Sequence, residues 1–149
     1  MLKNCALIGL TAVLTASVSG VFAQEKPGAK PVPGGYVLEK DAQVAKQEPG
    51  THNGGGQTIG YSFFSKTSKL GIVFRKRAFK PGSGIGYHLQ QEDEIYYVLS
   101  GRGMMNVDGK EFEVGPGDAV LTRPGSSHGL KQLGSEDLVI IINYEQTPK

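Results

Sequence analysis

Three side chains that can ligate a metal ion lie close together in the middle of the chain. His88, Gln90 and Glu94 fall within seven positions, on a background of β-prone apolar residues in the segment 82–101. On a strand, His88 and Gln90 are two residues apart, so both side chains leave the same face. A metal site needs a further ligand from elsewhere, and His128 is the obvious candidate. These residue types and spacings indicate a metal site built on strands.

The first residues have the pattern of an export signal. Lys3 is followed by an uncharged apolar run at 6–18, and small residues within 21–23 predict cleavage before Gln24. A membrane anchor is the alternative, but the run is shorter than the ~20 residues that a spanning helix needs. We therefore expect a signal peptide at 1–23, a periplasmic or extracellular location, and no membrane attachment after cleavage.

Composition limits the chemistry and the partners of the mature chain. Removal of 23 residues from the 149 also removes Cys5, the single cysteine, so no disulfide forms and a metal would have only N and O ligands. Loss of Lys3 changes the balance of 16 basic against 14 acidic residues to 15 against 14, which gives no indication of a nucleic-acid or anionic-membrane partner. We expect a flexible Pro/Gly lead-in at 24–35 and one domain at 36–149.

The pattern within the domain predicts short strands and little helix. Asp108-Gly109 between β-prone runs is the strongest hairpin signal. The run 138–144 is apolar throughout, so it is expected to be central in a sheet or buried on both sides. The acidic residues 92–94 interrupt the apolar pattern and predict a turn, and 41–47 predicts one helical turn. Besides the His88 strand, strands are expected at 36–38, 58–64, 70–79 (with a bulge or sheet switch), 104–107, 110–114, 119–122, 127–133 and 138–144. These elements predict an all-β antiparallel sandwich or barrel.

Two features near the predicted site have alternative interpretations. His52 lies in the glycine-rich segment 51–57 and either faces a pocket or is a solvated surface residue, the commoner case. The basic residues Arg75, Lys76 and Arg77 either contact an anionic substrate or form a charged strand face in solvent, again the commoner case.

The histidine segments together resemble the cupin superfamily, whose fold is a double-stranded β-helix or jelly-roll barrel. The first motif of that family reads G-x5-H-x-H-x3,4-E-x6-G. Gly82, His88, Glu94 and Gly101 fall at those spacings, whereas Gln90 stands where the second histidine belongs.

The second cupin motif, G-x5-P-x-G-x2-H-x3-N, is also present at the required spacing. Gly117 and His128 are eleven residues apart, Arg123 occupies the usual proline position, and Gln132 stands in place of the asparagine. The resemblance covers about residues 57–144 and implies a cupin barrel. It does not imply one activity, because this fold supports many reactions as well as binding without catalysis.

The resemblance implies a divalent metal site with His88, Gln90, Glu94 and His128 as ligands. Two histidines and a carboxylate suit Fe, Mn, Ni, Co or Zn. The Gln90 amide offers a neutral oxygen, a poorer donor than imidazole. It is therefore either a weak fourth ligand or a substrate contact beside an open metal position. A decayed metal site in a barrel that only binds a ligand is the alternative.

Two classes of function follow from the resemblance. The first is an exported metal-dependent enzyme of oxygenase, isomerase or lyase type, acting on a small oxygen-rich molecule such as a sugar acid or a phenolic. The second is a non-catalytic cupin that binds a small, sugar-like molecule with a weak or lost metal site. The family also implies a homodimer formed by sheet augmentation, for which the strand 138–144 is available.

Several residues are candidates for binding the substrate. Arg123 either binds a substrate carboxylate or forms a surface ion pair. Tyr87 and Tyr97 either supply hydrogen bonds and acid–base groups or pack in the core. Gln90 and His52 complete the set.

Overall fold

The computed structural model describes residues 34–146, and the residues from Tyr36 onward form one compact unit. The expected signal peptide and nearly all of the expected lead-in lie outside the described residues. Within this range no helix is long and apolar enough to cross a membrane. The elements are α1 (Asp41–Val44), β1 (Ala45–Pro49), η1 (Thr51–Asn53), β2 (Gln57–Phe63), β3 (Ile72–Phe79), β4 (Gly84–Leu89), β5 (Glu94–Ser100), β6 (Arg102–Val107), β7 (Lys110–Val114), β8 (Ala119–Thr122), β9 (Ser127–Leu133) and β10 (Leu138–Glu145).

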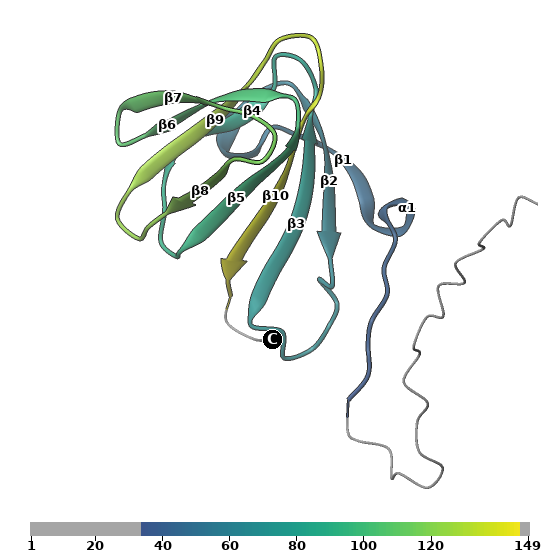
Figure 1. Ribbon diagram of the computed structural model, residues 1–149. Helices are drawn as coiled ribbons and strands as arrows, with labels where there is room; N and C mark the ends of the chain where they lie inside the picture. Colours follow the sequence, from purple (N-terminus) through teal and green to yellow (C-terminus); the bar gives the residue numbers. More distant parts are fainter. Residues whose placement is uncertain (1–33, 147–149) are drawn as a thin grey trace, which may run out of the picture. The chain divides into compact units, whose positions relative to one another are not determined.

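The strands form two antiparallel sheets that face each other, and the predicted all-β class is confirmed (Figure 1). One sheet has the order β1-β2-β3-β10-β5-β8 and the other the order β4-β9-β6-β7. Strand β10 lies between β3 and β5, as its continuous apolar sequence predicts. The predicted hairpin is also confirmed: Asp108 and Gly109 both have positive φ, and they join β6 to β7.

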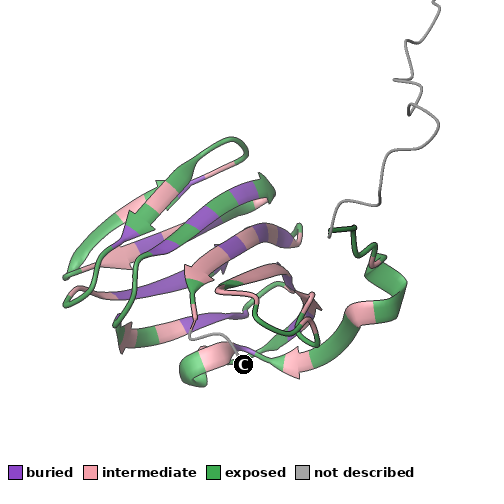
Figure 2. Cartoon of the chain, turned by 90° about the horizontal axis from the view of Figure 1, so that it is seen from below, coloured by how far each residue is buried: buried purple, intermediate pink, exposed green. Residues whose placement is uncertain are grey.

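Side-chain alternation along these strands creates the core between the sheets. Buried residues alternate with exposed ones along β5 and with partly exposed ones along β10, and Figure 2 shows such stripes along the strands. Register then places buried residues opposite one another: Tyr96 pairs with Ile142, and Val98 with Ile140. The core consists of Phe79, Ile85, Tyr96, Val98, Met105, Val114, Leu130, Leu138, Ile140 and Ile142.

The predicted strand at 36–38 is wrong, and a strand that the sequence did not indicate lies just beyond α1. Residues 36–38 have no regular structure, and Tyr36 is 91% exposed. Strand β1 instead pairs along its whole length with β2, at the edge of the sheet. Its sequence, AKQEP, has no apolar alternation because an edge strand of this kind buries almost nothing.

The bulge predicted within 70–79 is also wrong. Strand β3 keeps an unbroken register with both β2 and β10. One register shift lies in β4 instead, between Ile85 and His88, and another lies in the pairing of β10 with β5, where consecutive Val139 and Ile140 face Ser100 and Val98. The first of these has a consequence for the site. Ile85 and His88 are three residues apart, yet the extra residue directs both side chains inward, opposite Leu130 and His128.

The expected role of residues 138–144 in sheet augmentation does not agree with the topology. Both edges of β10 are already paired, with β3 and with β5, so no further strand can pair with it. The strands at the sheet edges are β1 and β8 in one sheet and β4 and β7 in the other.

The glycine-rich segment around η1 packs directly on the backbone of β4. A Cβ atom at Gly54 would overlap the carbonyl of Gly84, and a Cβ at Gly86 would overlap the carbonyl of His52. These positions therefore require glycine because two backbones approach closely there. His52 itself has left-handed backbone angles (φ 50°, ψ 39°), which the close packing against β4 maintains.

We predict that Gly86→Ala destabilises the protein by about 1–3 kcal/mol, because the added methyl group forces η1 away from β4. The measurement is the free energy of unfolding in urea. Gly115→Ala is the matched control, since a Cβ there meets no atom within 4 Å. Equal stability of the two variants would contradict the close approach.

Candidate metal centre

Three strands bring His88, Glu94 and His128 together, and the ligand atoms of these residues lie within 4.8 Å of one another. His88 on β4 is the direct register partner of His128 on β9, and their ring centroids are 4.4 Å apart. Glu94 begins β5 in the facing sheet, and its Oε2 lies 3.3 Å from Nε2 of His128. The three side chains that the sequence singled out as the strongest ligands therefore converge from both sheets.

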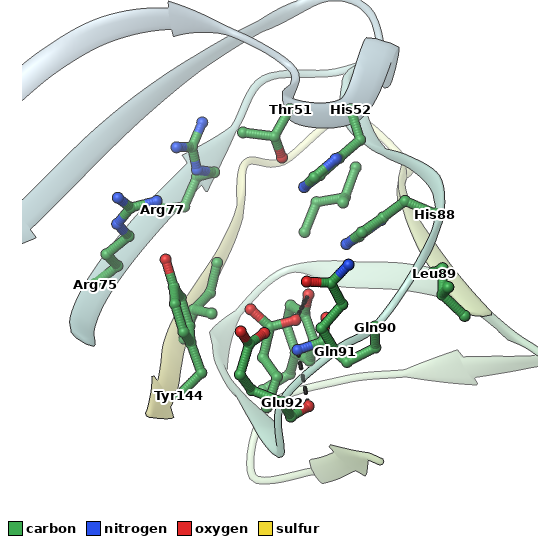
Figure 3. Close-up of a pocket in the computed structure, with 14 residues that line it drawn as sticks. Thr51, His52, Arg75, Arg77, His88, Leu89, Gln90, Gln91, Glu92 and Tyr144 are labelled. Atoms are coloured by element: carbon green, nitrogen blue, oxygen red, sulfur yellow. Dashed lines mark hydrogen bonds between the residues drawn. The ribbon is translucent and has the colours of Figure 1, made fainter. Parts of the chain in front are cut away.

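A pocket of about 330 Å³ opens beside this cluster (Figure 3). It lies between the sheets, and η1 forms part of its wall. His128 is fully buried, against the rings of His88 and Tyr96. The lining residues are Thr51, His52, Arg75, Arg77, Ile85, His88, Leu89, Gln90, Gln91, Glu92, Glu94, Tyr96, Ile142 and Tyr144.

The ring of His88 is held in an orientation that suits a metal ligand. Its Nδ1 lies 2.8 Å from the carbonyl oxygen of Gly86. A carbonyl only accepts, so Nδ1 carries the proton and donates it, which leaves the lone pair on Nε2 free. A hydrogen bond of this kind fixes tautomer and orientation in metal-ligating histidines.

His52 stacks on the other side of this assembly. Its ring is parallel to that of His88 within 5°, with a centroid separation of 3.5 Å. Burial lowers the pKa of His52 below its ordinary value, and the neighbouring His88 acts in the same direction. The structure thus places His52 at the pocket wall. The commoner interpretation of the sequence, a solvated surface histidine away from the site, is therefore not what the structure shows.

Tyr96 connects the two ligands that face each other across the sheets. Its hydroxyl lies 2.6 Å from Oε2 of Glu94 and 2.8 Å from Nε2 of His128. Burial, and then the charge of Glu94, raise the pKa of Tyr96 well above its ordinary value, so the hydroxyl stays neutral. Nδ1 of His128 is buried without a partner among the described residues.

The donor set fits a divalent first-row metal ion. Two imidazoles and one carboxylate are the ligands such ions take, and residues 34–146 contain no cysteine that could add a thiolate. A cation there would also balance the charge of the Glu94 carboxylate, which is almost fully buried. In the described part of the chain, no cationic side chain lies within 4.0 Å of this carboxylate except His128, which is a cation only if protonated.

Gln90 lies in the pocket wall, but part of its amide is already engaged. Its Nε2 donates to the carbonyl oxygen of Glu92 at 2.9 Å, the contact drawn dashed in Figure 3. Its backbone exchanges hydrogen bonds with Ser126 and Gly125, which ties the turn before β5 to the turn before β9. The amide oxygen remains available to the pocket.

Three predicted substrate contacts do not line this pocket. Tyr87 and Tyr97 are 56% and 44% exposed, so the core-packing interpretation is wrong for both, and neither lines this pocket. Arg123 forms a surface ion pair, with its Nε 2.7 Å from Oδ1 of Asp93. The ion-pair alternative is therefore the one the structure shows.

Among the pocket residues, Tyr96 and Tyr144 were not named from the sequence, and Arg75 and Arg77 were named only as a possible anion contact, with a solvated strand face as the commoner case. Tyr96 was detectable, because it is two residues from Glu94 on one strand and so shares its inward face. Tyr144 and Arg75 required knowledge of the strand order. Arg77 is almost fully buried, with Nη2 2.9 Å from Oε2 of Glu48 and Nη1 2.8 Å from the Thr58 hydroxyl.

Comparison with known proteins identifies the fold family. The cupin domain model matches residues 76–144, which contain all three clustered ligands. Two curated relatives match shorter stretches. An oxalate-binding protein of Thermotoga maritima is 37% identical over 67 residues, 44% of this chain and 55% of the relative. An uncharacterised protein of Methanocaldococcus jannaschii is 41% identical over 49 residues, 33% of this chain and 39% of the relative. The matches thus span about half or less of each relative.

Solved structures show the same fold at lower identity. A protein described as a predicted oxalate decarboxylase, from Thermotoga maritima, has a TM-score of 0.66 at 24% identity and covers 74% of this chain and 100% of its own. A putative sugar phosphate isomerase from Acidithiobacillus ferrooxidans has a TM-score of 0.64 at 22% identity, and the match covers 74% of this chain and 75% of that protein. A cupin 2 conserved barrel domain protein from Salinispora arenicola has a TM-score of 0.60 at 19% identity, and the match covers 76% of this chain and 91% of that protein. Residues 76–144 thus match the cupin domain, and the described chain has the jelly-roll barrel fold of that family.

We predict that Tyr96→Phe lowers the free energy of unfolding by about 1–3 kcal/mol, because it leaves buried Glu94 and His128 without a hydrogen-bond partner. Tyr87→Phe is the matched control, since this side chain is 56% exposed and is expected to change stability by less than about 0.5 kcal/mol. Urea denaturation of both variants provides the test. Equal losses would show that the Tyr96 hydroxyl is not engaged as described.

Proposed function

We propose that this cupin holds one divalent metal ion through His88, Glu94 and His128 and acts on a small oxygen-rich molecule bound in the adjoining pocket. The convergence of these three ligand atoms within 4.8 Å, beside a pocket of about 330 Å³, is the observation that carries the proposal. The size of the pocket suits a sugar acid, a small carboxylic acid or a phenolic rather than a polymer.

When bound, the metal supplies a Lewis acid for a substrate oxygen, which suits isomerase or lyase chemistry, or a site for oxygenase chemistry. The protein supplies the remaining groups. The neutral hydroxyl of Tyr96 lies beside Glu94 and keeps its proton at ordinary pH. The free oxygen of the Gln90 amide accepts a hydrogen bond from a substrate hydroxyl at the pocket wall. The stacked ring of His52 covers one side of His88 and limits access of water to it.

A binding protein without turnover is the second candidate. One curated relative is an oxalate-binding protein, which supports a small carboxylate as the ligand here. Gln90 in place of the second motif histidine also removes a strong metal donor, which favours a site that retains ligand better than metal. Ligand binding that survives metal removal would support this candidate over the enzyme.

We predict that the purified wild-type protein contains about one equivalent of Fe, Mn, Ni, Co or Zn and that His88→Ala loses it, because one of three ligands is gone. Elemental analysis of protein prepared without chelator measures this. Tyr87→Ala is the control, since this neighbouring side chain is exposed. Gln90→Ala is expected to retain the metal if Gln90 contacts substrate. Absence of metal from the wild type after reconstitution would contradict the proposal.

Export also belongs to this proposal, supported by the charge and apolar pattern at residues 1–23. We predict that protein recovered from the native cell envelope or medium begins at Gln24, as intact-mass measurement would show. A recovered chain that still begins at Met1 would contradict it.

A homodimer likewise remains a prediction, with a different surface from the one expected. Ile95, Tyr97, Leu99 and Leu121 are exposed apolar residues on β5 and β8, and Ile95 pairs directly with Leu121. A second copy packed on this face would bury them.

A further inference from the structure

We infer that Arg75 is the carboxylate-binding residue of the pocket, so that the molecule bound beside the metal centre is an organic acid. The inference rests on the proposed function for the place of binding, but it depends on the surroundings of Arg75 and not on the metal ligands.

Arg75 is on the inner face of the larger sheet and lines the pocket. Register gives the row Arg75–Ile142–Tyr96 across β3, β10 and β5. With strands about 4.8 Å apart, the Cα atoms of Arg75 and Tyr96 are separated by about 10 Å. One small molecule can therefore contact Arg75 at one end and the cluster around Glu94 at the other.

The Arg75 guanidinium lacks a partner, unlike the other basic side chains around it. Arg77 is paired with Glu48, and Lys76, which points to the outer face, is paired with Asp41. In the range 34–146 no carboxylate lies within 4.0 Å of Arg75, and its Nε is buried without any hydrogen-bond partner. A buried donor without a partner is costly, so its persistence indicates a ligand that supplies the acceptor.

The two acidic residues of the pocket do not neutralise this charge. The Glu94 carboxylate is hydrogen-bonded to Tyr96 and lies against His128. Glu92 is exposed, and its carboxylate forms no ion pair with Arg75. Arg75 is thus the pocket cation available to an anion.

The shape of the group indicates the chemical class that it binds. A guanidinium presents paired donors in one plane, which match the two oxygens of a carboxylate. Figure 3 shows the Tyr144 side chain beside Arg75, with its hydroxyl on the same side as the guanidinium. Tyr144 pairs with Val73, two residues from Arg75, and so is its diagonal neighbour across the strands. Together they favour acids over neutral sugars or simple phenols.

The test is calorimetric titration of the metal-reconstituted mature protein with probe pairs that differ in the carboxylate: gluconate against glucose, and 3,4-dihydroxybenzoate against catechol. Oxalate is added because of the curated relative. We expect at least one acid to bind and its neutral counterpart to bind at least about tenfold more weakly. Arg75→Gln should weaken the acid about 10- to 100-fold, as loss of a charged hydrogen bond implies, and Arg75→Lys should recover part of the affinity.

Lys76→Gln is the matched control, since this adjacent cation points away from the pocket, and it should bind the acid as the wild type does. Metal content and unfolding free energy are measured for every variant. Acid binding unchanged in Arg75→Gln, or equal binding of acids and neutral counterparts, would overturn the inference even with metal present. Arg75-dependent acid binding in a wild type that takes up no metal would sustain the inference and refute the metal-centre proposal.

Discussion

The pairing of β4 with β9 is the constraint on which the site depends. It makes His88 and His128 direct partners, and it includes one extra residue between Ile85 and His88. Without that residue, two positions three apart would point to opposite faces, and either Ile85 would leave the core or His88 would leave the pocket. The same stretch contains Gly86, whose carbonyl orients the His88 ring and whose lack of a side chain admits His52. Core, ligand and pocket wall are therefore fixed by one local irregularity.

The sequence predicted the centre of the site well because its signals are local. The spacing of His88 and Glu94 and the second-motif position of His128 determine the ligand set. The core-packing interpretation of Tyr87 and Tyr97 is wrong for another reason. Tyr97 lies one residue from inward-facing Tyr96, so strand period assigns it to the outer face. Tyr87 would share the face of Ile85 by strand period, but the extra residue before His88 turns it outward. Applying the inward direction of Glu94 to its own strand would have selected Tyr96.

Other parts of the site were not predictable from local pattern. Arg75 faces the pocket because β3 pairs with β10, and nothing near it in the sequence states which strand it will join. The β4 bulge is hidden for a similar reason, because the segment reads as one strand. The glycines of segment 51–57 left the position of His52 open between a pocket and solvent. In the structure they pack on β4 and bring His52 onto His88. This contact joins residues more than thirty positions apart, so tertiary structure alone decides it.

The charges around the pocket couple the two proposed ligands. Without a metal, the buried carboxylate of Glu94 lies on one side and the unpaired guanidinium of Arg75 on the other, so an incoming anion meets attraction and repulsion together. A divalent cation beside Glu94 reverses the sign of the charge there and removes the repulsion. An acid should then bind more tightly with metal present, and by thermodynamic reciprocity the acid must strengthen metal binding by the same factor. If both proposals hold, this coupling would offset the weak donor at Gln90, because a bound acid would stabilise a metal held by His88, Glu94 and His128.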